Sequence, residues 1–195
     1  AIGQPFTRHW SYFPMVMRRF HTLLVASVCF LFTFAHAEPR NLFRDLTDGV
    51  AFNYPAQWET KQQRTGQYRV MVGDKDEFGG SCMLSTKRNQ TLAQYGDMEA
   101  IRAITAKDIE NGARQSGAII SILTFEQTII GNRPAILYTA NSSYESLGIK
   151  VPLKILAGVV KVGDRLYELG CVAPPKAADR DRNIFVSVVG SLTVR

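Results

Sequence analysis

The sequence predicts an α+β fold in which helices cover an antiparallel β-sheet. Short runs of alternating apolar residues, separated by turns rich in Gly, Pro, Asn and Asp, indicate strands on both sides of residues 91–114. Apolar residues recur at helical spacing in residues 91–114 and again in residues 184–192. This order of strands, one long helix, more strands and a closing helix is typical of an α+β sandwich.

The first predicted strands are short and separated by clear breaks. Residues 49–58 indicate a strand that Pro55 ends, because proline has no N–H for a sheet ladder, and a turn then precedes Trp58. Residues 67–72 alternate between apolar and polar side chains, and residues 81–86 follow after a Gly-Asp-Lys-Asp turn. Together these three segments predict an antiparallel meander.

Residues 91–114 are predicted to form one long helix. Thr91, with Gln94 three residues later, matches a capping box. The apolar residues that define one broad face are Leu92, Tyr95, Met98, Ile101, Ile104 and Ile109. We interpret this face as core packing and the acidic residues between its members as the solvated side.

The second half of the chain is predicted to contain four strands and a closing helix. The strands are residues 118–130, 133–144, 151–162 and 165–173. Gly131-Asn132 and Gly163-Asp164 have the composition of tight hairpin turns that need positive φ. Pro174-Pro175 stops the last strand, and the apolar residues of the closing helix are Ile184, Phe185, Val188, Val189 and Leu192.

Four features of the sequence form a recognisable set. They are Phe52-Asn53-Tyr54-Pro55-Ala56-Gln57-Trp58, the central helix, Tyr167-Glu168-Leu169 after a hairpin, and Val188-Val189-Gly190-Ser191-Leu192. Together they resemble the PsbP-like family. The resemblance implies a single α-β-α sandwich over residues 38–195. It is a family of extrinsic photosystem II subunits, a Ran-binding transport factor and bacterial envelope proteins. The histidines proposed to bind metal in the plant members have no match here, nor does a long basic extension, so a photosynthetic role is not expected.

The beginning of the sequence is predicted to be a cleavable export signal. Arg18, Arg19 and His21 precede the apolar stretch Thr22 to Ala35, and Ala35-His36-Ala37 supplies a small-x-small cleavage site. The apolar stretch is short for a membrane-spanning helix, which needs about 20 residues. We expect residues 1–14 to lie upstream of the true start at Met15 or Met17. Residues 15–37 would be the signal peptide, removed before Glu38, and the mature protein would be periplasmic or secreted.

Composition excludes several function classes for residues 38–195. The removed segment holds three of the 23 basic residues and none of the 17 acidic ones, which leaves a net charge of only +3 and makes nucleic acid an unexpected partner. All three histidines, His9, His21 and His36, also lie in the removed segment. The predicted mature chain therefore has no Ser-His-Asp or Cys-His arrangement and no histidine metal ligand.

Two cysteines remain after cleavage, Cys82 and Cys171. In an oxidising compartment an exported pair of this kind is expected to form a disulfide, which we predict to be structural because no CxxC spacing exists. A loop of this length would contribute roughly 4 to 5 kcal/mol in the chain-entropy treatment. The alternative is two buried thiols that behave as small apolar residues.

Other candidate sites favour ordinary structural interpretations. Asp74 to Gly79 begins like a calcium loop, but Phe78 stands where an oxygen ligand belongs and Ser85 stands where the loop needs glutamate, so we interpret it as an acidic turn. No metal, cofactor or catalytic residue is predicted. Tyr54 and Trp58 are the candidate ligand- or partner-binding residues, because aromatic residues are enriched in binding surfaces. The alternative for Trp58 is that it covers the core.

The predicted function is an exported, non-enzymatic accessory or interaction module for an envelope protein complex, not membrane-spanning once mature. A first alternative is a periplasmic small-ligand binding protein with a pocket between sheet and helix. A second is a histidine-free hydrolase or lyase that uses carboxylates. A pocket of about 300 Å³ or more with converging polar groups would favour the alternatives over a flat apolar patch.

Overall fold

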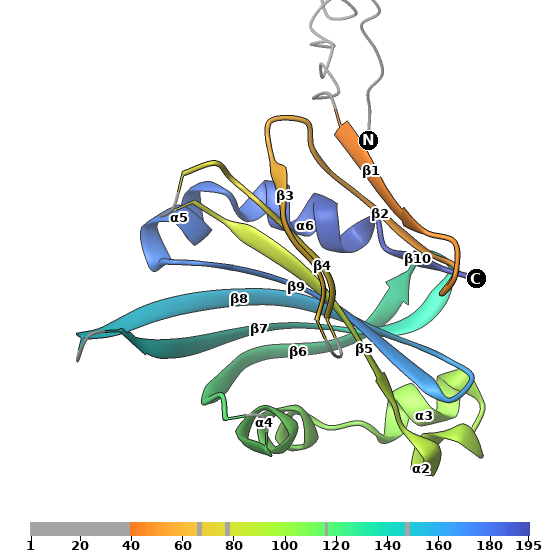
Figure 1. The fold of residues 1–195 in the computed structure, drawn as a ribbon. Helices are drawn as coiled ribbons and strands as arrows, with labels where there is room; N and C mark the ends of the chain where they lie inside the picture. The colour runs from red at the N-terminus through yellow and green to blue at the C-terminus, as the bar shows by residue number, and fades with distance from the viewer. Residues whose placement is uncertain (1–39, 66–67, 77–78, 116, 147–148) are drawn as a thin grey trace, which may run out of the picture. The chain divides into compact units, whose positions relative to one another are not determined.

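A computed structural model describes residues 40–65, 68–76, 79–115, 117–146 and 149–195, all of which belong to one unit, Glu38–Arg195. The predicted signal peptide lies outside these residues, and so do Glu77 and Phe78 of the Asp74 turn. The described chain has two antiparallel sheets and short helices (Figure 1). This confirms the predicted α+β class.

The larger sheet has seven strands in the order β3-β4-β5-β9-β8-β7-β6, and every neighbouring pair is antiparallel. The strands are β3 (Glu59–Thr65), β4 (Tyr68–Gly73), β5 (Ser81–Arg88), β6 (Ile120–Ile130), β7 (Arg133–Ser146), β8 (Ile149–Val162) and β9 (Arg165–Ala173). Six of them match predicted strands. β3 was not predicted, because its sequence ETKQQRT has no apolar alternation and the strand lies at the edge of the sheet.

The smaller sheet has three strands in the order β1-β2-β10. β2 (Val50–Pro55) is the predicted first strand, and Pro55 ends it as expected. β1 (Arg40–Asp45) and β10 (Thr193–Val194) were not predicted. β1 is an edge strand whose exposed side is partly basic, and β10 has only two residues, so neither carries a clear period-two signal.

The prediction of one helix over residues 91–114 is wrong. Three helices occupy this stretch, α2 (Gln90–Ala93), α3 (Asp97–Ala103) and α4 (Ala106–Gln115). The backbone is extended at Gly96 (ψ 155°) and at Ile104 (ψ 130°), and both residues therefore interrupt the helical path.

Side-chain caps mark the starts of α2 and α4, and the α4 cap directly follows the break at Ile104. The N-cap of the first helix is Asn89, whose side chain accepts a hydrogen bond from Leu92 N at 3.2 Å, whereas the predicted cap Thr91 lies inside the helix. A second capping arrangement starts α4. Asp108 Oδ2 accepts from Thr105 N at 2.9 Å and from Thr105 Oγ1 at 2.6 Å.

The C-terminal part agrees with the sequence prediction. β9 ends at Ala173, Pro175 begins α5 (Pro175–Arg180), and α6 (Arg182–Gly190) contains most of the predicted closing helix. The turns also have the expected left-handed residues, with φ of 55° at Gly131, 66° at Asn132 and 61° at Gly163. A Cβ at Gly131 would lie 2.3 Å from the carbonyl oxygen of Leu192, so this hairpin turn packs directly on the C-terminal segment.

One face of the larger sheet carries the main core. α5 and α6 lie on this side (Figure 1), and the smaller sheet contributes Val50 and Phe52 to the same cluster. Cys82 and Cys171 are directly opposite each other on β5 and β9, are fully buried, and form a disulfide with an S–S distance of 2.02 Å. This confirms the predicted pairing.

Candidate functional site

The opposite face of the larger sheet is only partly covered by helices. α3 packs on β7 and β8, and α4 packs on β6 (Figure 1). A second core cluster lies beneath them and includes Ile101 of α3 and the sheet residues Ile136, Tyr138 and Val159. The helical cover is thus centred on the β6 side of the sheet.

The remaining part of this face belongs to β4, β5 and β9. Along each of these strands, every second residue is buried in the main core, and the residues between them point to the other face and are only half-buried. We call them the open face, which consists of Met71, Met83, Ser85, Glu168, Gly170 and Val172. A Cβ added at Gly170 would meet only the Cβ of Ala157, at 3.5 Å, so little of the described chain lies above this point.

A hydrogen-bonded pair, Tyr138 and Glu168, lies where the covered and open parts meet. The Tyr138 hydroxyl donates a hydrogen bond to Glu168 Oε1. Tyr138 is on β7 and Glu168 is two strands away on β9, with Ala157 of β8 as the register neighbour of Tyr138. The small side chain at Ala157 leaves room for the tyrosine to reach across β8.

Burial dominates the electrostatics of this pair. Desolvation raises the pKa of the Glu168 carboxyl above its ordinary value, and the hydrogen bond from Tyr138 opposes this only in part. Desolvation and the neighbouring carboxylate also raise the pKa of the Tyr138 hydroxyl. Tyr138 therefore stays a neutral donor, and Glu168 holds its proton to a higher pH than an exposed glutamate does.

The polar groups around this pair are few. Ser85 is the register partner of Glu168, and among the described residues no lysine forms a hydrogen bond or ion pair with Tyr138 or Glu168. Among the described residues, no group of three or more His, Cys, Asp or Glu side chains could hold a metal ion. What the site offers is one carboxyl group, one hydroxyl group and apolar surface.

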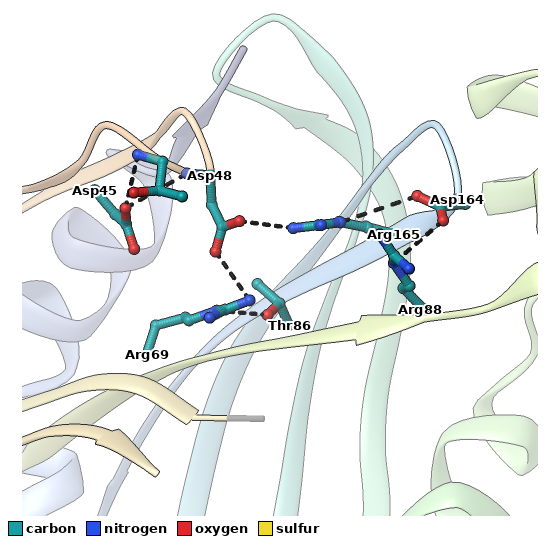
Figure 2. A network of polar contacts seen from close by, with 8 residues as sticks. Asp45, Asp48, Arg69, Thr86, Arg88, Asp164 and Arg165 are labelled. Atoms are coloured by element: carbon teal, nitrogen blue, oxygen red, sulfur yellow. Dashed lines mark hydrogen bonds and ion pairs between the residues drawn. The ribbon is translucent and has the colours of Figure 1, made fainter. Parts of the chain in front are cut away.

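A second low-exposure acid, Asp48, has a different environment (Figure 2). Asp48 Oδ1 accepts a hydrogen bond from Arg165 Nη1 at 2.6 Å, and Arg69 Nη2 lies 2.9 Å from Oδ2 as an ion pair without hydrogen-bond geometry. Arg69 also donates from Nε to Thr86 Oγ1 at 2.8 Å. Asp48 lies in the β1–β2 turn, so this cluster ties the smaller sheet to β4 and β9.

The structure places the predicted binding residues on the main-core side. Trp58 is only 4% exposed and packs edge to face against Phe185, with ring centroids 6.4 Å apart. This position agrees with the alternative that Trp58 covers the core. Tyr54 is half-buried, with its ring 6.1 Å from that of Phe52. A binding role for these two residues stays a prediction.

Sequence reasoning missed Glu168. Its motif Tyr167-Glu168-Leu169 was recognised, but a glutamate between two core residues of a strand normally points to solvent. Its partner Tyr138 is 30 residues away and meets it only through the strand order β7-β8-β9. No local pattern could have identified the pair.

Comparisons with known proteins agree with the architecture. The family model described as PsbP matches residues 40–194. The solution structure of cyanobacterial PsbP (CyanoP) from Synechocystis sp. PCC 6803 is 15% identical, covers 84% of this chain and 96% of its own, and has a TM-score of 0.56. The Ran-binding protein Mog1p of Saccharomyces cerevisiae is 9% identical, with coverages of 81% and 96% and a TM-score of 0.53.

At these identities the likeness to solved structures concerns the fold. No curated protein sequence matches the chain significantly. None of the helices in the described ranges is long and apolar enough to cross a membrane.

Proposed function

We propose, from the premise that this chain belongs to the PsbP family, that it is an exported accessory module without enzymatic activity that binds a protein partner in the cell envelope. The open face is the proposed binding surface. Membership of the family explains the fold, whereas the function depends on the chemistry of the exposed surface.

The observation that carries this proposal is the uneven cover of the larger sheet. Met71, Met83 and Val172 lie in the middle strands of a seven-stranded sheet, yet each is only half-buried. Methionine side chains adapt to the shape of what they contact and are common in protein-binding surfaces. A partner on the open face would complete the cover that α3 and α4 begin.

Two features support export. Residues 18–37 have the three parts of a signal peptide, and the disulfide between Cys82 and Cys171 is the kind of bond that persists in oxidising compartments. The proposed compartment is the periplasm or the medium.

Site-specific photo-crosslinking in the native envelope tests the proposal. A photoreactive residue in place of Met83 should join the protein to one partner in stoichiometric yield, identified by mass spectrometry. The matched control is Val186, which is 48% exposed on α6, on the opposite side of the sheet. A third probe at Tyr54 tests the predicted aromatic site. Equal yields at Met83 and Val186 would contradict the open face as the binding surface.

A second candidate function is small-ligand binding, which the Tyr138–Glu168 pair favours. Two polar groups that meet on an apolar surface are typical of ligand sites. If no probe captures a protein and the exported chain is a clean monomer, this candidate becomes the stronger one.

A further inference from the structure

We propose that Glu168 and Tyr138 form the recognition site for a lysine or arginine side chain of the partner protein. This inference rests on the proposed function, because the cation would arrive as part of the partner that covers the open face. It specifies the chemistry of that partner at one point of the surface.

In the part of the chain that the structure describes, Glu168 lacks the positively charged partner that comparable acids in this protein have. Two other acids of low exposure pair with arginine: Asp48 with Arg69 and Arg165, and Asp181 with Arg180 at 2.7 Å. Glu168 differs, because within the described ranges no lysine or arginine forms an ion pair with it.

The lysines closest to Glu168 by register do not fill this role. Lys87 of β5 and Lys161 of β8 are both register partners of Leu166, which lies two residues before Glu168 on β9. Lys161 is buried and committed elsewhere, since its Nζ lies 3.0 Å from Asp97 Oδ1 and 3.0 Å from the Tyr95 carbonyl oxygen. Lys87 is exposed, and among the described residues it forms no ion pair with Glu168. We therefore expect the positively charged partner of Glu168 to come from another molecule.

The surface beside Glu168 has room for a side chain of the partner. Gly170 lies two residues after Glu168 on the same face, and an added Cβ there would make only an ordinary contact with Ala157. This leaves a shallow position beside the carboxyl group. Its neighbours across the strands are Met83 and Ala157, which would flank an aliphatic stem.

The hydrogen-bonding groups of Tyr138 and Glu168 suit a cationic side chain. The tyrosine hydroxyl occupies Glu168 Oε1, which leaves the other carboxylate oxygen and its lone pairs for a donor. A hydrogen bond between an ammonium or guanidinium group and a carboxylate is stronger in a poorly solvated site than in water. The long stems of lysine and arginine pack on apolar surface while the head group is bound. A lysine or arginine side chain therefore fits both the carboxylate and the apolar surface beside it.

The test is an NMR titration of the ¹⁵N-labelled mature domain at pH 7 with three capped tripeptides, acetyl-Ala-Xaa-Ala-amide. Xaa is lysine, the uncharged isostere norleucine, or glutamate. The lysine peptide should shift the amide signals of Glu168 and Gly170 in a saturable way. The norleucine peptide should bind about ten-fold more weakly, the loss expected for one hydrogen bond to a charged group, and the glutamate peptide should not bind.

Three variants sharpen the result. Glu168→Gln keeps an acceptor for Tyr138 but removes the charge, and should weaken lysine-peptide binding about ten-fold. Gly170→Leu fills the open position and should abolish binding, with the unperturbed spectrum of distant residues showing that the domain is folded. Glu126→Gln removes an exposed carboxylate on β6 and should leave binding unchanged.

Several outcomes would overturn the inference. They are equal binding of the lysine and norleucine peptides, unchanged binding in Glu168→Gln, or no saturable shift with any peptide. Tighter binding of free spermidine than of the lysine peptide would assign the site to a soluble polyamine instead. All of these outcomes are compatible with a crosslink from Met83 to a partner, so they contradict this inference and not the proposed function. If the proposed function is wrong, no crosslink forms at Met83, whatever the result of the peptide titration.

Discussion

The two faces of the larger sheet differ most clearly at neighbouring residues of one strand. On β5, Leu84 is fully buried in the main core, while Met83 is half-buried on the open face. On β9, Leu169 and Glu168 show the same contrast. Because side chains alternate along a strand, one stretch of sequence builds a stable core on one side and leaves a surface with different chemistry on the other.

Asp48 and Glu168 also differ from each other, in how their charges are balanced. Asp48 is held between two arginines and links the two sheets, so its charge is compensated within the chain. Glu168 receives one hydrogen bond from a neutral tyrosine. A compensated buried charge stabilises an arrangement, whereas an uncompensated one costs stability and is more often retained for binding.

The largest expected effect concerns the disulfide on the covered face. The double variant Cys82→Ala/Cys171→Ala should lower the free energy of unfolding by roughly 4 kcal/mol, because the bond closes a sequence separation of 89 residues. Urea denaturation of the oxidised protein and the variant measures this. A loss below about 1 kcal/mol would mean that the covered face is stable without its covalent link.

Leu84→Ala and Met83→Ala test the two faces directly. Leu84→Ala should destabilise the protein by about 3 kcal/mol, because it removes a fully buried side chain and leaves a cavity. Met83→Ala should cost less than about 1 kcal/mol and should instead reduce capture of the partner. Similar losses of stability in both variants, again from urea denaturation, would contradict the distinction between the faces.

Asp48→Asn should destabilise the protein by about 2 to 3 kcal/mol, because Arg69 and Arg165 would lose the charge that they share. Asp164→Asn is the matched control. Asp164 is more exposed and lies 3.4 Å from Arg88 and 4.0 Å from Arg165, so its loss should cost less than about 1 kcal/mol. Thermal unfolding of both variants makes the comparison, and a smaller effect at Asp48 than at Asp164 would refute the linking role.

The smallest effect is the pH dependence of stability at Glu168. Because its pKa is raised in the folded state, folding favours the protonated form, and stability should fall as pH rises from the unfolded pKa through the folded pKa. Glu168→Gln should remove this loss and stabilise the protein at pH 7 by on the order of 1 kcal/mol. Unfolding measured from pH 4 to pH 8 tests this. Parallel curves for the two proteins would show that Glu168 does not titrate in this range.

Much of the fold was predictable from the sequence, because the central strands and the closing helix carry clear periodicity. The failures have physical causes. Edge strands β1 and β3 need no apolar alternation, and the break at Ile104 precedes a Thr105–Asp108 cap that competes with a continuous apolar pattern. The disulfide was predicted from compartment chemistry. The Glu168–Tyr138 pair was not predictable, since it arises only when three strands lie side by side.

The pairing of β5 with β9 also bears on how the domain assembles. The hairpins of β6, β7, β8 and β9 are local, and so are those of β3, β4 and β5, but the two groups meet only along β5 and β9. When the chain is exported N-terminus first, Cys82 therefore stays unpaired until β9 has also been exported. Contacts between residues so far apart in the sequence form slowly. Closure of the disulfide would then mark the moment at which the sheet is complete, and a domain halted before that point would expose the edge of β5 to other chains.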